Sequence, residues 1–461
     1  MRRRILLVEP DFRSKFPPLG MMKLSTYHKL LGDQVVFIRG LSSEMRSKKW
    51  DRVYISTLFT FHWKKTEETI RYYLSAVEAR KNVIVGGVLA TLFADELEES
   101  FGIRVVRGLL NAKGDLDRNS LIVDEMIPDY SILKEVDYEY ANTDSYLCHS
   151  TRGCPNSCHF CAVNRIEPCF SHYKCLTRQV RSIEELYGTK RKLLLLDNNI
   201  LASRSFAKIV GEIVELGFYR NATLNGRLRF VDFNQGVDMR LLDEPKMKLI
   251  AKTAIKPLRI AFDHISLKNM YIDKVKLASE NGILNLSNYV LYNFKDTPKD
   301  FYERLRINVY LNNQVGTKIF SFPMRYIPLD AKERGYISKH WSWQLLRGIQ
   351  CILLATKGKV GPKTDFFHAA FGNTYDDFIR ICMMPENYII YRRHHENNGA
   401  MDWNNTYKKL SQNQKRWLFE ATALRKFSKD DLRKTSSIKL QRLLSHYIET
   451  DRATTSKSID V

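Results

Sequence analysis

The sequence predicts an α/β fold in three parts: an N-terminal doubly wound parallel sheet, a partial (β/α)6 barrel and a helical C-terminal region. Short apolar, β-rich runs alternate with amphipathic helical stretches through most of the chain, which is typical of parallel sheets. The alternation then stops, and helical stretches alone follow. We place the domains at 1–125, 146–335 and 336–461, with a linker at 126–145.

The first part contains five candidate strands, separated by candidate helices. The strands are the runs at 5–10, 34–40, 51–61, 82–90 and 104–108, and the helices are expected at 17–32, 64–81 and 93–102. Gly86 and Gly87 stand where a strand passes into a helix. They would let a phosphate or a cofactor tail approach a helix N-terminus, although a tight turn explains them equally well.

The second part repeats the pattern of a strand followed by a helix. Candidate strand ends lie at 192–200, 228–242, 256–264, 284–294 and 317–329, and a further candidate strand begins at Ser145. In parallel barrels the chemistry lies at the carboxyl ends of the strands and in the loops that follow them. The polar residues at these ends are therefore the candidates for ligand contacts.

The composition is that of a globular protein with a strong positive charge. The 461 residues carry a formal net charge of +22, which favours an anionic partner such as nucleic acid or reflects a generally basic surface. The apolar run near the N-terminus is too short for a signal peptide, and no run approaches the roughly 18 residues of a membrane span. We therefore expect a cytoplasmic protein without a membrane partner.

Six of the eight cysteines lie between Cys148 and Cys175, which indicates metal or redox chemistry rather than disulfides. The segment STRGCPNSCHFCAV (150–163) spaces Cys154, Cys158 and Cys161 as C-x3-C-x2-C. Three thiolates can ligate three irons of a cubane cluster and leave the fourth iron open to another ligand. A structural zinc site is the alternative, with a fourth ligand from His149, His159, Cys169 or Cys175.

The cysteine segment resembles the signature of the radical SAM superfamily, including the aromatic Phe160 directly before the last cysteine. The upstream part resembles the flavodoxin-like, cobalamin-binding-type domain that precedes the barrel in one branch of that superfamily. The resemblance implies a [4Fe–4S] cluster on the three cysteines, and S-adenosylmethionine cleaved reductively to a 5′-deoxyadenosyl radical. It also implies an electron donor such as flavodoxin or ferredoxin.

The resemblance is incomplete at the cobalamin site. The Asp-x-His-x-x-Gly segment, which supplies an axial histidine in that branch, is absent, and His28 does not stand in such a pattern. The domain either binds cobalamin without this histidine, or is a relic, or docks the substrate, and we favour the last two.

Polar residues at the barrel strand ends are the candidates for contacts with S-adenosylmethionine. The candidates are Asp197, Asn198, Gln235, Asp238, Arg240, Tyr292 and Arg325, and Asn199 directly follows the first two. Asp263 and His264 end the candidate strand at 256–264. Helix caps, and a buried structural pair between Asp238 and Arg240, are the alternatives. No catalytic residue can be named.

Three functions remain open. The first is a radical SAM enzyme that modifies nucleic acid or a nucleotide-like substrate, as the charge suggests. The second is a radical SAM enzyme acting on a small metabolite, a lipid or a peptide. The third is a non-catalytic, zinc-stabilised nucleic-acid-binding protein.

Overall fold

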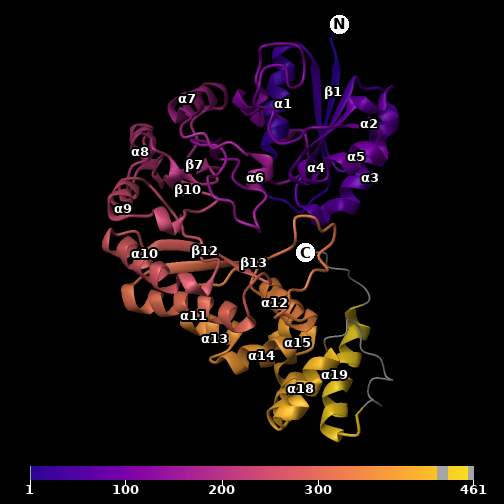
Figure 1. Cartoon of the computed structure of the whole chain (residues 1–461), viewed down its shortest axis with the longest axis vertical. Coiled ribbons are helices and arrows are strands. Elements are labelled where there is room, and N and C mark those ends of the chain that lie inside the picture. The colour runs from indigo at the N-terminus through magenta and orange to yellow at the C-terminus, as the bar shows by residue number, and fades with distance from the viewer. Residues whose placement is uncertain (1, 423–434, 455–461) are drawn as a thin grey trace. The chain divides into compact units, whose positions relative to one another are not determined.

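The computed structural model describes residues 2–422 and 435–454 (Figure 1). The chain divides into two compact units, of which the first contains the chain up to Arg259 together with Ile327–Tyr336. The second contains Ile260–Tyr326 and the described residues from Ile337 onward. The division falls inside the range 146–335 predicted for the barrel. The domain boundaries drawn from the sequence stay a prediction.

The first unit begins with a five-stranded parallel sheet in the order β2-β1-β3-β4-β5. Its strands are β1 (Arg4–Glu9), β2 (Gln34–Arg39), β3 (Arg52–Thr57), β4 (Val83–Gly87) and β5 (Arg104–Val105). This order is that of the flavodoxin-like doubly wound fold, and it confirms the prediction for this part.

Helices cover both faces of this sheet (Figure 1). They are α1 (Leu19–Leu30), α2 (Ser43–Ser47), α3 (Trp63–Tyr73), α4 (Val88–Leu92) and α5 (Ala94–Phe101). Leu6 and Val8 of β1 join a core with Ile70 of α3 and Leu97 of α5. Successive side chains of a strand alternate between its faces, so the buried Leu7 points to the opposite side. Coverage of both faces explains why the strands read as continuous apolar runs.

The helix predicted over 64–81 is shorter than expected, because α3 ends at Tyr73. A 3₁₀ turn follows, and Val77 then forms a parallel bridge with Trp50, whose amide donates to the carbonyl of Ala76. A helical continuation would withdraw this segment from its backbone partner. Local periodicity does not carry that information.

The predicted linker 126–145 is fixed to α1 rather than extended. Asp129 accepts hydrogen bonds from Ser25 (2.7 Å) and Lys29 (2.6 Å) of α1. Tyr130 lies in a short 3₁₀ helix (Tyr130–Lys134), and its hydroxyl donates to the carbonyl of Ser145 at 2.8 Å. The start of the next strand is therefore held by residues that precede it.

The first unit continues with a three-stranded parallel sheet in the order β10-β7-β6. Its strands are β6 (Ser145–Cys148), β7 (Lys192–Leu195) and β10 (Phe230–Phe233). Outside this sheet, β8 (Thr223–Leu224) and β9 (Arg227–Leu228) form a hairpin before β10, and β11 (Leu258–Arg259) follows later in the chain. The helices among them are α6 (Val163–Ile166), α7 (Leu176–Tyr187), α8 (Phe206–Glu215) and α9 (Glu244–Ala251). Strands and helices alternate here as predicted.

The second unit begins with two parallel strands, β12 (Asn285–Tyr292) and β13 (Lys318–Arg325), accompanied by α10 (Lys268–Glu280) and α11 (Pro298–Val315). Arg304 of α11 is fully buried, pairs with Asp296 at 2.7 Å and donates to the carbonyls of Phe262 and Asp263. This guanidinium satisfies backbone groups in the loop after Ile260, and it is a structural element of the unit.

The rest of the second unit is helical, as predicted for the part of 336–461 that the structure describes. The helices are α12 (Trp343–Ala355), α13 (Thr364–Phe371), α14 (Tyr375–Met383), α15 (Glu386–Ile390), α16 (Arg392–His395), α17 (Met401–Lys408), α18 (Gln412–Thr422) and α19 (Ile438–Thr454). All of these helices except α16 share one apolar core with β12 and α11, in which Trp403 and Phe378 are fully buried. Among the described residues, no helix combines the length and apolar character needed to cross a membrane.

Gly87, the last residue of β4, provides a test of this fold. Its φ is +112°, and a Cβ there would lie 2.2 Å from the carbonyl oxygen of Thr57 in β3. We expect Gly87→Ala to lower the free energy of unfolding by about 3 kcal/mol, because steric overlap adds to backbone strain. Urea denaturation measures the change.

Gly32→Ala is the matched control for that variant. Gly32 has a φ of +78°, but no atom outside its immediate chain neighbours lies within 4 Å of the place that a Cβ would take, so this change tests strain without overlap. It should cost about 1 kcal/mol. Equal costs for the two variants would contradict the close approach of β3 and β4.

Candidate functional site

The cysteine-bearing loop begins directly after β6, and a buried carboxylate fixes its first residues. Asp197, which follows β7, accepts hydrogen bonds from the backbone amides and the hydroxyls of both Ser150 and Thr151. Burial raises the pKa of Asp197, and the bonds from Ser150 and Thr151 oppose that rise. These contacts join the start of the loop to the end of the neighbouring strand.

A second carboxylate holds the residues next to the first cysteine. Glu167 accepts from the Arg152 guanidinium (3.0 Å), the Gly153 amide (2.7 Å) and the Asn198 side-chain amide (3.0 Å). Gly153 has a φ of +71°, and a Cβ there would lie 2.4 Å from the carbonyl oxygen of Cys169. Glycine is therefore required where the loop folds back on itself.

The three predicted ligands lie on this loop and are partly exposed. The Cys154 sulfur accepts from the Asn156 amide at 3.5 Å and from the Asn199 side-chain amide at 3.7 Å. The amide of Cys161 donates to the carbonyl of Cys158 at 3.0 Å, which forms a tight turn between these two cysteines. Hydrogen bonds to a thiolate sulfur are a recognised feature of iron–sulfur sites.

The loop has the donor chemistry of an iron–sulfur site. Across 2–422 and 435–454, no three His, Cys, Asp or Glu side chains are arranged as a ligand set for a metal ion. Three accessible thiols close together in the chain, with N–H groups directed at one sulfur, fit a cubane that has three protein ligands. Of the possible fourth zinc ligands, His149 is buried, and its Nε2 lies 3.0 Å from the Arg152 guanidinium.

The strand-end residues of the first unit lie beside the loop, but most have protein partners. Asp197 and Asn198 hold the loop as described above. Arg240 donates twice to Asp238, with both distances at 2.7 Å, so the two residues pair as considered from the sequence, but the pair is not buried, because the Arg240 side chain is exposed. Asp238 also accepts from the Asn156 side chain at 2.9 Å, whereas Gln235 is exposed. The predicted contacts with S-adenosylmethionine stay a prediction.

The remaining candidates belong to the second unit. Tyr292 and Arg325 are register partners at the ends of β12 and β13. Tyr292 is buried in the core, and its ring packs against Phe301 with the centroids 4.9 Å apart. The His264 side chain accepts from the Ser266 amide, which is the capping role considered for it. Tyr292 therefore has a packing function whatever its role toward a ligand.

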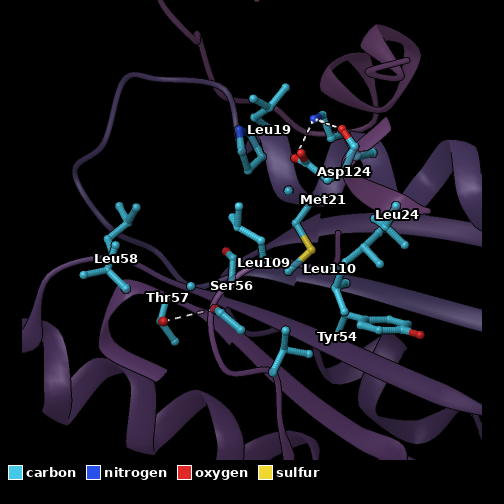
Figure 2. A pocket seen from close by; sticks show the side chains of 18 of the residues that line it. Leu19, Met21, Leu24, Tyr54, Ser56, Thr57, Leu58, Leu109, Leu110 and Asp124 are labelled. Carbon is cyan, nitrogen blue, oxygen red and sulfur yellow. Dashed lines mark hydrogen bonds and ion pairs between the residues drawn. The ribbon is translucent and has the colours of Figure 1, made fainter. Parts of the chain in front are cut away.

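The N-terminal sheet carries a cavity of about 380 Å³ at the carboxyl edge of its strands. Figure 2 shows Met21, Leu109 and Leu110 gathered over the strand ends, near Leu58 and Thr57. Further lining residues are Phe16, Pro17, Pro18, Leu19, Leu24, Val106 and Val123, together with Gly86 and Gly87. The carboxyl edge of a doubly wound sheet is where ligands bind in this fold class. From the sequence, only the two glycines indicated this cavity.

One acidic residue joins the cavity wall to the cysteine loop. Asp124 pairs with Lys23 of α1 (3.1 Å) and Lys174 (2.8 Å), and with the Arg152 guanidinium; Figure 2 shows Asp124 at the rim. Burial opposes its ionisation, but the charges of Lys23 and Arg152 keep the pKa of Asp124 below its ordinary value. Arg152 and His149 line the same cavity, so its occupant would contact the loop that carries Cys154.

The cavity wall supplies no axial histidine for a cobalamin. His149 is the one histidine among the described lining residues, and it contacts Arg152. His28 is fully buried between Asp33 (2.7 Å) and the hydroxyl of Tyr54 (2.9 Å), and burial lowers its pKa to about 4. Because the residues do not fit a histidine-ligated cobalamin, we assign no chemical step to that cofactor.

Glu9, at the end of β1, gives the cavity a titratable group. Burial raises the pKa of Glu9 to about 7, against the hydrogen bond from Tyr140 and the charge of Arg39. Between pH 4.5 and 7 the unfolded chain loses this proton while the folded chain keeps it, so stability falls as the pH rises. We expect the free energy of unfolding of wild type to fall by about 3 kcal/mol relative to that of Glu9→Gln as the pH rises across this window.

Urea denaturation of both proteins at about pH 4 and about pH 8, on either side of that window, measures this difference. Glutamine keeps an oxygen that can accept the Tyr140 hydrogen bond, so the variant isolates the charge. A difference that stays constant with pH would show that Glu9 ionises normally in the folded protein.

Comparison with solved structures identifies the fold. One similar structure is TsrM from Kitasatospora setae, a radical S-adenosylmethionine methyltransferase that was solved with cobalamin and a [4Fe–4S] cluster bound. It aligns with a TM-score of 0.51 at 16% sequence identity, and the alignment covers 68% of this chain and 74% of TsrM. Its form with tryptophan and a SAM analogue aligns with a TM-score of 0.51 at 14% identity, covering 76% of each chain. Apo OxsB, a cobalamin-dependent S-adenosylmethionine radical enzyme, aligns with a TM-score of 0.46 at 12% sequence identity. This alignment covers 91% of this chain and 70% of OxsB.

The sequence comparisons add no relative: no family model matches the chain, and the search of curated proteins finds no significant match. The structural likeness to TsrM nevertheless extends over two thirds or more of the chain. The chain therefore shares the fold of TsrM over this part of its length.

Proposed function

We propose that this protein is a radical SAM enzyme. The observation that carries the proposal is the loop after β6: three cysteines spaced C-x3-C-x2-C, on a loop anchored by Asp197 and Glu167, in a fold shared with TsrM. Cys154, Cys158 and Cys161 would hold a [4Fe–4S] cluster with one iron open. When bound, the cluster supplies the electron that splits a carbon–sulfur bond of S-adenosylmethionine.

The chain's own residues hold the cysteine loop in position at this site. Asp197 and Glu167 fix the loop, and the Asn156 side chain joins the loop to Asp238, which follows β10. The polar strand-end residues predicted from the sequence stay the candidates for S-adenosylmethionine contacts; among them, Asn198 also binds Glu167 and Arg240 also binds Asp238. A small redox protein such as flavodoxin or ferredoxin is the electron donor that this chemistry requires.

The substrate class is proposed from charge. A net charge of +22 favours an anionic substrate, and we put nucleic acid or a nucleotide-like molecule first. The apolar cavity favours the second candidate, a small molecule or lipid docked beside Arg152. Asp124 and Arg152 line the cavity and pair with each other, and Arg152 belongs to the cysteine loop. In either case an occupant of the cavity would therefore lie close to the cysteines.

Anaerobic reconstitution with iron and sulfide tests the cluster. We expect about four irons per chain in the wild type, and almost none after Cys154→Ala, Cys158→Ala and Cys161→Ala combined, because the protein ligands are lost. With dithionite and S-adenosylmethionine, the wild type should release 5′-deoxyadenosine. Iron analysis and chromatography are the measurements.

The matched control is the double variant Cys169→Ala and Cys175→Ala, which removes two exposed thiols of the same segment and should keep its iron. Purified protein that binds zinc but no iron would overturn the proposal. So would a loaded cluster that never cleaves S-adenosylmethionine.

The same assay separates the substrate classes. If nucleic acid is the substrate, added RNA or DNA should raise the yield of 5′-deoxyadenosine several-fold, because substrate binding completes the site. Binding that weakens steeply with salt, without a change in yield, would show contact through charge alone. That result would favour the small-molecule class.

A further inference from the structure

Asn199 has a side chain that its local turn does not use. The residue precedes a 3₁₀ turn (Ile200–Ala202) at the carboxyl end of β7, where asparagine commonly caps the backbone. Here the side chain makes no capping hydrogen bond, and the residue is only 3% exposed. Its burial therefore has another cause than the turn.

The side-chain amide of Asn199 is directed at the first cysteine of the loop. Its Nδ2 lies 3.7 Å from the Cys154 sulfur, within hydrogen-bond range for sulfur. The backbone amide of Asn156 donates to the same sulfur at 3.5 Å. Cys154 thus receives one donor from its own loop and one from the neighbouring strand end.

The orientation of this amide follows from charge. The Oδ1 atom of Asn199 is buried and has no hydrogen-bond partner in the described part of the chain. The contact with Cys154 therefore decides which end of the amide faces the sulfur. A thiolate repels a carbonyl oxygen and attracts an N–H group, so the donor end is the end that faces a metal-bound cysteine.

We propose that Asn199 is a positioning residue that tunes the iron–sulfur cluster through an N–H···S hydrogen bond to Cys154. The inference rests on the proposed cluster and goes beyond it by naming one residue that sets the reduction potential. A hydrogen bond to a thiolate withdraws charge from the sulfur and stabilises the reduced, more negative state. Asn199 therefore raises the reduction potential of the cluster.

Two substitutions test this role. Asn199→Leu removes the donor without adding charge, and Asn199→Asp keeps the shape but replaces the donor with a negatively charged acceptor. We expect both reconstituted variants to keep about four irons. Both should show a lower midpoint potential than wild type, and the aspartate variant should show the larger shift. Redox titration followed by electron paramagnetic resonance, without S-adenosylmethionine, measures the potential.

Asn156→Ala is the matched control, because it removes a neighbouring side-chain amide but keeps the backbone N–H that donates to Cys154. Its midpoint potential should match that of the wild type. A wild-type potential in a fully loaded Asn199→Leu protein would overturn the inference. Loss of iron in both Asn199 variants, but not in Asn156→Ala, would also overturn it and assign Asn199 a purely structural role. Wild-type protein that takes up no cluster would refute the proposed function instead.

Discussion

The site depends on one buried carboxylate. Asp197 accepts hydrogen bonds from two consecutive backbone amides and two hydroxyls, of Ser150 and Thr151, at the point where β6 ends and the cysteine loop begins. Ordering this loop costs conformational entropy, which the hydrogen bonds to Asp197 help to offset. By satisfying four donors at once, the carboxylate fixes the first two residues of the loop where the chain leaves the sheet.

A second network extends this anchorage to the N-terminal sheet and its helices. Asp124 lies between Lys23 of α1 and Arg152 of the loop, and Arg152 contacts Glu167, which holds Gly153 beside Cys154. Each charge in this series has an opposite partner, as buried charges require. The wall of the apolar cavity and the start of the cysteine loop are thus parts of one hydrogen-bonded structure.

The three polar residues after β7, Asp197, Asn198 and Asn199, have different partners. Asp197 anchors the loop, Asn198 contacts Glu167, and Asn199 is directed at the Cys154 sulfur. The three side chains are adjacent in sequence, yet each binds a different part of the same loop. Polar residues at the end of a strand can therefore bind the neighbouring cysteine loop itself.

The alternation of strands and helices and the spacing of the cysteines could be predicted before folding was considered, because both are local patterns: periodicity and ligand spacing require no knowledge of distant residues. The helix after Trp63 was predicted too long, because its end depends on pairing between Val77 and Trp50. The partner of each strand-end side chain could be identified only in the folded protein, and so could the cavity that the ends of β1, β3 and β4 form with Asp124 and Arg152. These contacts join residues that lie far apart in the sequence, and their formation depends on side-chain direction and burial, which the one-dimensional pattern does not contain.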